Sequence, residues 1–215
     1  MVAQARCASF IYSPFSLSLH MAVYQNKLII IAAPSGAGKT SVTRHLLQTL
    51  PEQLGFSISA ATRQPRHHEI DRVDYYFISV EAFQEKIQQE EFIEWEMVYE
   101  GKYYGTLKSE LQRIWQQNKA PLLDVDVKGG IHVQQQFPTT SLSLFIEPPS
   151  IEELERRLLA RGTETPESLQ ARLSKASYEL SFKQQFDKII LNDNLERACK
   201  EAEQLVRNFL NPKTP

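Results

Sequence analysis

The spacing of hydrophobic residues predicts strands and helices that alternate along most of the chain. Four short, mainly apolar runs are typical of strands buried on both faces. They are residues 28–32, 121–127, 142–146 and 188–191. Six further segments carry apolar side chains every three or four positions, as helices do. They are residues 41–50, 80–90, 150–161 and 195–210, the segment around Leu111, and the one after Pro166. Strands that alternate with helices form a parallel sheet covered on both faces, so we expect an α/β fold.

The middle of the chain departs from this alternation. Residues 56–59 and 75–78 have the pattern of short strands. Residues 92–98 alternate apolar and acidic side chains, which predicts a strand whose solvent-exposed face carries Glu94 and Glu96. We expect residues 103–106 (Tyr-Tyr-Gly-Thr) to form a turn.

The first apolar run leads into a segment with the features of a phosphate-binding loop. Its residues are Ala33, Pro34, Ser35, Gly36, Ala37, Gly38, Lys39 and Thr40. Small residues let backbone N–H groups face one oxyanion, and the following helix presents its positive N-terminal end. Lys39 adds a charge for the outer phosphates, and the Thr40 hydroxyl is a Mg²⁺ ligand.

One departure leaves an alternative open for this loop. The usual pattern begins with Gly, where this chain has Ala33. An ordinary strand–turn–helix would need Gly36 and Gly38 only for a tight turn. The apolar strand before the loop and the amphipathic helix after it favour a nucleoside triphosphate site.

Composition limits the other classes of function. The 215 residues carry a net charge of −2, which excludes a broadly basic protein that coats nucleic acid. No apolar run approaches the length that spans a membrane. Two cysteines give neither a disulfide framework nor metal-ligand spacing, and we expect a cytoplasmic protein.

Residues 1–22 are expected to be a disordered or dispensable extension, with Met21 as a plausible start, ahead of one domain at 23–215.

Three further groups of charged residues have both a chemical and a structural interpretation. Arg63 and Arg66 lie in a polar segment that could simply be a solvated loop. Arg157 and Arg161 share a helix face, but Glu153 could engage Arg157 in a surface ion pair worth only ~0.3–0.5 kcal/mol. Asp124 and Asp126 alternate along a buried strand. Because buried carboxylates need partners, we expect their face to meet Mg²⁺, its waters or a substrate.

Taken together, these motifs closely resemble the guanylate kinase family. The resemblance covers about residues 27–209 and rests on the phosphate loop, residues 59–66, Glu94, residues 104–106 and the arginines after Pro149. It implies a P-loop core with a five-stranded parallel sheet, an inserted GMP-binding lobe at about 57–106 and a helical lid at about 157–172. It also implies transfer of the ATP γ-phosphoryl group to GMP, with Mg²⁺ as cofactor.

The resemblance assigns residues to the GMP side. Arg63, Arg66, Tyr75 and Tyr104 match positions that bind the GMP phosphate. Glu94 matches the carboxylate that reads guanine, with hydroxyl partners at Ser59 and Thr106. Asp124 is a further candidate for the GMP site. Asp124 and Asp126 are both candidates for Mg²⁺, directly or through water, together with Thr40, and the sequence does not separate their roles.

On the ATP side, the resemblance implies that Arg157, Arg161 and Arg172 close over the phosphates and act in catalysis with Lys39 and Arg63. Asn192 matches a position near the adenine, although an ordinary turn asparagine is an equal alternative.

Two other functions are alternatives to this one. One is a catalytically inactive module of the same family that binds phosphopeptides. Such modules have a damaged phosphate loop, whereas this chain keeps Lys39 and Thr40. The other is a kinase for a different nucleoside monophosphate, against which Glu94 argues. The expected partners are ATP and GMP, with no nucleic acid and no membrane, and the sequence predicts no oligomeric state.

Overall fold

The computed structural model describes residues 24, 26–67, 69–99, 101–160 and 165–212. The predicted extension at 1–22 and the predicted lid residue Arg161 lie outside the described residues. Within the described part of the chain, no helix has both the length and the apolar character needed to cross a bilayer.

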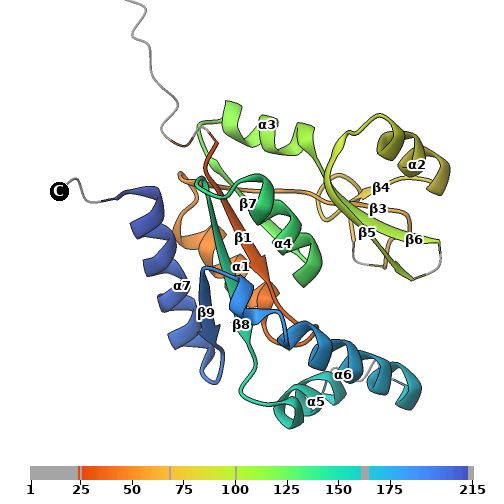
Figure 1. The fold of residues 1–215 in the computed structure, drawn as a ribbon, viewed down its shortest axis with the longest axis vertical. Helices are drawn as coiled ribbons and strands as arrows, with labels where there is room; N and C mark the ends of the chain where they lie inside the picture. The colour runs from red at the N-terminus through yellow and green to blue at the C-terminus, as the bar shows by residue number, and fades with distance from the viewer. Residues whose placement is uncertain (1–23, 25, 68, 100, 161–164, 213–215) are drawn as a thin grey trace, which may run out of the picture.

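Five parallel strands form the central sheet in the order β2-β7-β1-β8-β9 (Figure 1). They are β1 (Leu28–Ala32), β2 (Leu54–Phe56), β7 (Ala120–Val125), β8 (Ser141–Glu147) and β9 (Lys188–Leu191). The central strand β1 pairs with β7 and β8, with Ile31 opposite Asp124 and Leu144. Because β1 and β7 are parallel neighbours, the segments that follow their carboxyl ends meet at one edge of the sheet. The expected parallel sheet is confirmed.

Helices cover both faces of this sheet. Strand β1 is fully buried, and its alternate residues serve opposite faces. Ile29 and Ile31 pack in the cluster that contains residues of α1 (Lys39–Thr49) and α7 (Leu195–Leu210). Leu28 and Ile30 pack with residues of α3 (Lys108–Gln116) and α4 (Val127–Gln136).

A second sheet forms a lobe beside the core, at the right of Figure 1. Its order is β4-β3-β6-β5, with β3 (Ala60–Ala61), β4 (Tyr76–Phe77), β5 (Phe92–Tyr99) and β6 (Lys102–Leu107). Helix α2 (Val80–Gln88) packs on it through Phe83, which stacks on Phe92 at a centroid distance of 4.3 Å. The lobe is inserted between β2 and α3, where the sequence predicted an insertion.

A pair of helices lies at the bottom of Figure 1, below the lobe. They are α5 (Ile151–Leu159) and α6 (Pro166–Leu180), followed by the short 3₁₀ helix η1 (Lys183–Gln185). The Oγ atom of Ser150 accepts the Glu153 N–H at the start of α5. At the start of α6, Thr165 and Ser168 form a reciprocal capping box ahead of Pro166.

The turn predicted at residues 103–106 was wrong. These residues belong to β6, which pairs with β5 in antiparallel register. Gly105 suggested a turn, but its role is close packing. A Cβ atom there would lie 2.8 Å from the Glu94 carbonyl oxygen and 2.9 Å from side-chain atoms of Phe92 and Trp95.

The exposed face predicted for residues 92–98 was wrong at Glu94. Glu94 is only 6% exposed, whereas Trp95 and Met97 are 43% and 49% exposed. The strand lies in a lobe whose acidic face is turned toward the core. The alternation therefore marked the two faces correctly but not which of them meets solvent.

The predicted strand at 121–127 was also wrong at its end. Strand β7 ends at Val125, and Asp126 is the N-cap of α4, with Oδ1 accepting the Gly129 N–H at 2.7 Å. Helix α4 was not predicted, because Gly129 and Gly130 lower the helix propensity of its first turn. Asp124 and Asp126 therefore do not share a strand face.

Candidate active site

The loop between β1 and α1 has the geometry of an anion-binding site. Gly36 and Gly38 have φ angles of 94° and 102°, which other residues rarely adopt. A Cβ atom on Gly38 would also overlap the side-chain amide of Asn192. Helix α1 begins directly at Lys39, so its N-terminal N–H groups lie beside this loop. Ala33, in place of the usual Gly, is buried in the core at the end of β1.

A cavity of about 340 Å³, which we call the donor cavity, opens over this loop. Of the predicted ATP-binding residues, it is lined by Ala33, Pro34, Ser35, Gly36, Gly38, Lys39 and Thr40. Its other walls include Arg66 from the lobe and Arg172 from α6. Arg172 Nη1 donates to Ser35 Oγ at 3.0 Å, so a predicted lid arginine already contacts the loop.

Lys39 is held by the end of β7. Its Nζ lies 2.5 Å from Asp124 Oδ1 and donates to the Val125 carbonyl at 2.8 Å. Burial lowers the pKa of Lys39, but the Asp124 carboxylate more than offsets this and the pKa is raised. Lys39 is therefore a permanent cation whose present partner is a carboxylate.

A second cavity of about 310 Å³, the acceptor cavity, lies between the core and the lobe. Of the predicted GMP-site residues, it is lined by Ser59, Tyr75, Glu94, Tyr104 and Asp124. The two cavities share Ser35, Lys39, Val98, Asp126 and Lys175 as walls. Groups bound in the two cavities would therefore meet beside Lys39.

Glu94 is a buried acid at the wall of the acceptor cavity. Its Oε1 accepts a hydrogen bond from the Thr106 hydroxyl at 2.6 Å. Burial raises the pKa of Glu94 to about 7; the Thr106 bond opposes this shift, and the Asp126 charge adds to it. Such a carboxylate needs donors from a ligand to be stable in its ionised form.

The structure separates the two aspartates. Asp124 pairs with Lys39. Asp126 lies close to Glu94, because a Cβ atom on Gly129 would lie 2.7 Å from Glu94 Oε2 and 3.2 Å from Asp126 Oδ1. Asp124 is therefore oriented toward the phosphate loop, and Asp126 stands beside the carboxylate predicted to read the base.

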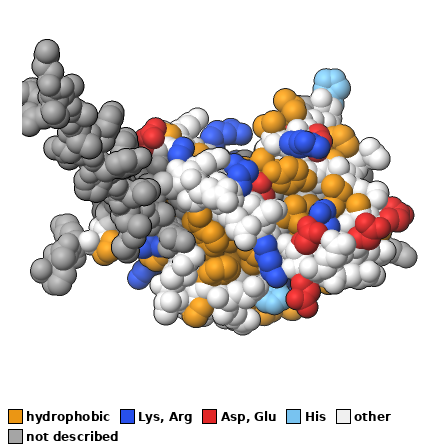
Figure 2. All heavy atoms as spheres, turned by 90° about the horizontal axis from the view of Figure 1, so that it is seen from above, with side chains coloured by type: hydrophobic (Ala, Val, Ile, Leu, Met, Phe, Trp, Pro, Cys, Tyr) orange, Lys and Arg blue, Asp and Glu red, His pale blue; other side chains and the backbone are white. Residues whose placement is uncertain are grey.

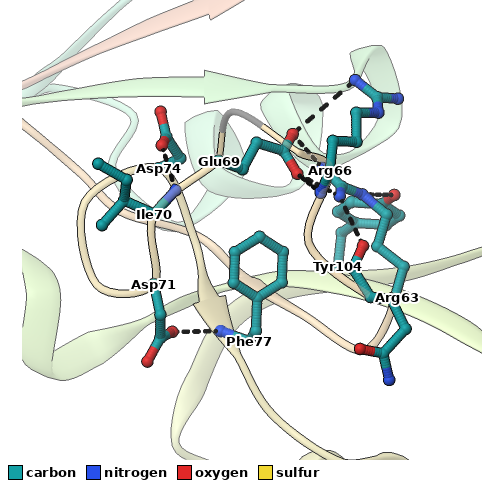
Figure 3. A network of polar contacts seen from close by, with 9 residues as sticks. Arg63, Arg66, Glu69, Ile70, Asp71, Asp74, Phe77 and Tyr104 are labelled. Atoms are coloured by element: carbon teal, nitrogen blue, oxygen red, sulfur yellow. Dashed lines mark hydrogen bonds and ion pairs between the residues drawn. The ribbon is translucent and has the colours of Figure 1, made fainter.

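Arg63 is fixed by a residue that sequence reasoning missed, Glu69 (Figure 3). Arg63 Nη1 and Nη2 donate to the two Glu69 oxygens at 2.5 and 2.7 Å. Its Nε donates to the Tyr104 hydroxyl at 3.0 Å, and its guanidinium lies 5.0 Å from the Tyr75 ring centroid. With the Nη1 bond to the Gln64 carbonyl, four of its five N–H groups are used.

Arg66 differs from Arg63 in its freedom. Its side chain is 65% exposed and lies 3.8 Å from Glu69, although its backbone N–H donates to Glu69 at 2.8 Å. The Arg63 bonds lower the pKa of Glu69 to about 2, so this carboxylate stays ionised. Glu69 therefore fixes the Arg63 side chain and the Arg66 backbone, while the Arg66 guanidinium stays largely exposed to solvent.

Two predicted ATP-side residues lie behind the loop rather than in the donor cavity. Arg157 donates to Glu153 Oε1 at 2.8 Å and to the Asn192 carbonyl at 2.9 Å. Asn192 is buried, and its Nδ2 donates to the Ala37 carbonyl at 2.7 Å. In this conformation both residues support the phosphate loop from behind. The buried side chain of Asn192 is therefore neither placed for contact with adenine nor typical of an ordinary turn asparagine.

Sequence reasoning also missed Lys175 and Glu179, which line the donor cavity from α6. Their spacing from Arg172 was the available signal, because residues three, four and seven positions apart share a helix face.

A parallel-sheet core with a phosphate loop, and a separate acceptor cavity walled by an inserted lobe, defines the class of P-loop nucleoside monophosphate kinases. The family model described as guanylate kinase matches residues 25–209. The chain belongs to the guanylate kinase family.

Individual relatives agree with this placement. The chain is 42% identical over 200 residues to a guanylate kinase of Bacteroides thetaiotaomicron, covering 93% of this chain and 98% of that protein. It is 46% identical over 185 residues to one of Bacteroides fragilis, covering 86% and 90%. A crystal structure of guanylate kinase from Anaplasma phagocytophilum matches with a TM-score of 0.70 and 27% identity, covering 87% of each chain.

Proposed function

We propose an assignment of residues for phosphoryl transfer from ATP to GMP, the activity of the family to which the chain belongs. ATP occupies the donor cavity with its phosphates on the loop, and GMP occupies the acceptor cavity. The observation that carries this assignment is the buried acid Glu94 beside a phosphate loop, in a cavity that shares Lys39 with the donor side.

The reaction needs cations and alignment rather than proton transfer. An oxygen of the GMP phosphate supplies the electron pair for a new bond to the γ-phosphorus. The bond from that phosphorus to the β–γ bridging oxygen breaks, and its electron pair leaves with ADP. The GMP phosphate has a second pKa near 6 and is largely ionised at pH 7, so no general base is required. Charge neutralisation supplies most of the catalysis.

Guanine is recognised by acceptors for its two adjacent donors, N1–H and the 2-amino group. Glu94 accepts from these donors, and Asp126 stands beside it as a second acceptor. Ser59, at the cavity wall, donates to O6, while Thr106 holds Glu94 in place. Adenine has a lone pair at N1 and no 2-amino group, so it would leave these carboxylates without donors.

The GMP phosphate is bound by a mobile arginine and a fixed frame. Arg66 lines the donor cavity rather than the acceptor cavity in this conformation, so its exposed side chain must turn toward the acceptor side to supply a guanidinium to that phosphate. Arg63, held by Glu69, supplies a fixed charge and orients the hydroxyl of Tyr104, and Tyr75 adds a second phenol at the same wall. Arg157 and Arg161 are assigned to the ATP side with Arg172. Of the two that the structure describes, Arg157 and Arg172, it is Arg172 that contacts the loop in this conformation.

Mg²⁺ fits the donor set at the phosphate loop. Mg²⁺ sites in kinases use one or two protein oxygens, with waters and substrate phosphates completing the shell. Thr40 offers a hydroxyl at the donor cavity, and Asp124 offers a carboxylate beside Lys39. We assign Asp124 to Mg²⁺, through water, and Asp126 to guanine. When bound, the ion neutralises charge that develops on the β- and γ-phosphate oxygens.

A cytoplasmic location, where ATP is abundant, is part of this proposal.

The test is a phosphotransfer assay with ATP and each of GMP, AMP, CMP and UMP. We expect GMP to be used at least about 10⁴-fold better than AMP, measured as kcat/KM. A chain that binds nucleotides but transfers nothing would instead favour the inactive binding module.

A further inference from the structure

Helix α6 turns one charged face toward the two cavities. Arg172, Lys175 and Glu179 lie on this face at spacings of three and four residues. Arg172 stands at the donor end, where it contacts Ser35 of the phosphate loop. Lys175, one helical turn further on, lines both the donor and the acceptor cavity.

The walls common to both cavities carry few cations among the described residues. Those walls include Lys39 and Lys175 together with Asp126. Lys39 is engaged by Asp124, and Glu179 adds another acid at the donor side. ATP and GMP would bring two sets of negatively charged phosphates to these shared walls. A second cation there, besides Lys39, would reduce the repulsion between them.

Lys175 is held loosely enough to serve there. Its Nζ lies 3.6 Å from Glu179 Oε1, which is longer than a normal charge-assisted hydrogen bond. Its side chain is 46% exposed, whereas that of Glu179 is 9% exposed. A lysine is a compact charge on a flexible stem, so it can exchange this partner for a phosphate oxygen at small energetic cost.

We propose that Lys175 is a further catalytic residue, which donates to an equatorial oxygen of the phosphoryl group in transit between the two cavities. This inference rests on the proposed function. Bond making at the GMP oxygen and bond breaking at the β–γ bridging oxygen proceed as described above. The Lys175 ammonium keeps its three protons throughout and stabilises charge on the transferring group.

The competing interpretation is an ordinary helix ion pair, and the chain offers a matched control for it. Lys200 and Glu196 form a pair four residues apart on α7, with Nζ 2.6 Å from Oε1. Lys200 is 70% exposed and belongs to a helix that lines neither cavity. If Lys175 served only to neutralise a neighbouring glutamate, Lys175→Met and Lys200→Met would have similar effects.

The first experiment compares steady-state kinetics of Lys175→Met, Lys175→Arg and Lys200→Met. We expect Lys175→Met to lower kcat roughly 100-fold, with KM for ATP and for GMP changed by no more than about threefold. Lys175→Arg keeps the charge and should restore part of the loss. Lys200→Met should stay within about twofold of wild type.

The second experiment measures binding without turnover, using a bisubstrate probe in which five phosphates link adenosine to guanosine. Lys175→Met should weaken this probe by roughly tenfold or more while leaving the affinities for ATP and GMP alone almost unchanged. An unchanged kcat, an unchanged probe affinity, or a loss shared equally by the single nucleotides would each overturn the proposal. If the wild-type protein failed to phosphorylate GMP, the proposed function would be wrong. The affinity of Lys175→Met for the probe would still test whether Lys175 contacts the bridging phosphates.

Discussion

At the scale of single residues, Glu94 shows how this site gives up stability for recognition. A buried carboxylate with one hydroxyl donor is poorly solvated, and burial raises its pKa to about 7. The guanine N1–H and 2-amino groups are the donors that the free protein does not supply to it. A residue of this kind is typical of a binding site rather than of a core optimised for folding.

Replacing Glu94 by Gln should therefore stabilise the free protein in a pH-dependent way. Because the folded pKa is raised above the ordinary value of 4.5, ionisation of Glu94 opposes folding. The penalty is absent well below pH 4.5 and is complete above about pH 7. The stability gain of Glu94→Gln should be larger at pH 8 than at pH 5 by about 2 kcal/mol, measured by urea unfolding. A gain that is equal at both pH values would contradict this account.

The same substitution should impair the use of GMP. One donor–acceptor pair with guanine becomes donor against donor, so kcat/KM for GMP should fall at least about tenfold. Glu96→Gln is the control. Glu96 lies two residues along on the same strand face and also lines the acceptor cavity, but it is less buried than Glu94, and we expect its replacement to do little. Equal, small effects of the two substitutions would remove Glu94 from base recognition.

Glu69→Ala should weaken the binding of GMP by removing contacts to its phosphate, without affecting the contacts to its base. Without Glu69, Arg63 and the Arg66 backbone lose their common anchor. We expect the GMP dissociation constant to rise roughly tenfold, while that of guanosine, which has no phosphate, stays the same. Glu203→Ala, which removes the carboxylate partner of Arg207 and of His45 away from both cavities, is the control. A parallel loss for guanosine would show that Glu69 shapes the whole lobe instead.

At the scale of secondary-structure elements, the core could be predicted from the sequence and the lobe only in part. Buried parallel strands such as β1 are apolar on both faces, so composition alone marks them. Strand β6 could not be distinguished from a turn, because Gly105 is required by packing against β5. Helix α4 carries Gly129 and Gly130 in its first turn, and its formation there depends on tertiary contacts that a sequence pattern does not reveal.

The candidate site shows the same division. The phosphate loop is a local segment and could be read directly. Glu69, Lys175 and the separation of Asp124 from Asp126 depend on which segments meet in space, which single-sequence patterns do not encode. The face of β5 that carries Glu94 could be identified as distinct, but its burial depends on how the lobe faces the core.

Glu110 joins the lobe to the core and carries a prediction at this scale. Its carboxylate accepts from the Tyr76 hydroxyl at 2.6 Å, the Ile58 N–H at 3.0 Å and the Arg113 guanidinium at 2.8 and 2.9 Å. Ile58 precedes Ser59 at the acceptor cavity, so the hydrogen bonds of Glu110 fix the segment by which the chain enters the lobe.

Glu110→Ala should destabilise the fold by about 3 kcal/mol, because it leaves a partly buried arginine and two further donors without an acceptor. Tyr76→Phe removes only one of these bonds and should cost about 1 kcal/mol. Unfolding in urea gives both values. If Glu110→Ala were no more harmful than Tyr76→Phe, Glu110 would not be a structural anchor.

At the scale of the whole molecule, cations reach the donor cavity from both sides. Arg66 comes from the lobe, at the upper right of Figure 1, and Arg172 from α6, at the bottom. Figure 2 shows Lys and Arg side chains interspersed with acidic ones on the visible face, without a continuous basic field. Attraction of two polyanions must then come from the cations gathered at the cavities.

Those cations predict positive coupling between the two nucleotides. Two polyanions in adjacent cavities would repel each other, unless Lys39, Arg66 and Lys175 are drawn into contact with both. We expect a non-hydrolysable ATP analogue with Mg²⁺ to tighten GMP binding by roughly tenfold in titration calorimetry. By linkage, GMP must tighten the analogue by the same factor. Arg66→Ala should reduce the coupling, whereas Arg207→Ala, on α7, should leave it intact. Binding of the two nucleotides that is independent or mutually weakening in wild type would show that the cavities do not share their cations.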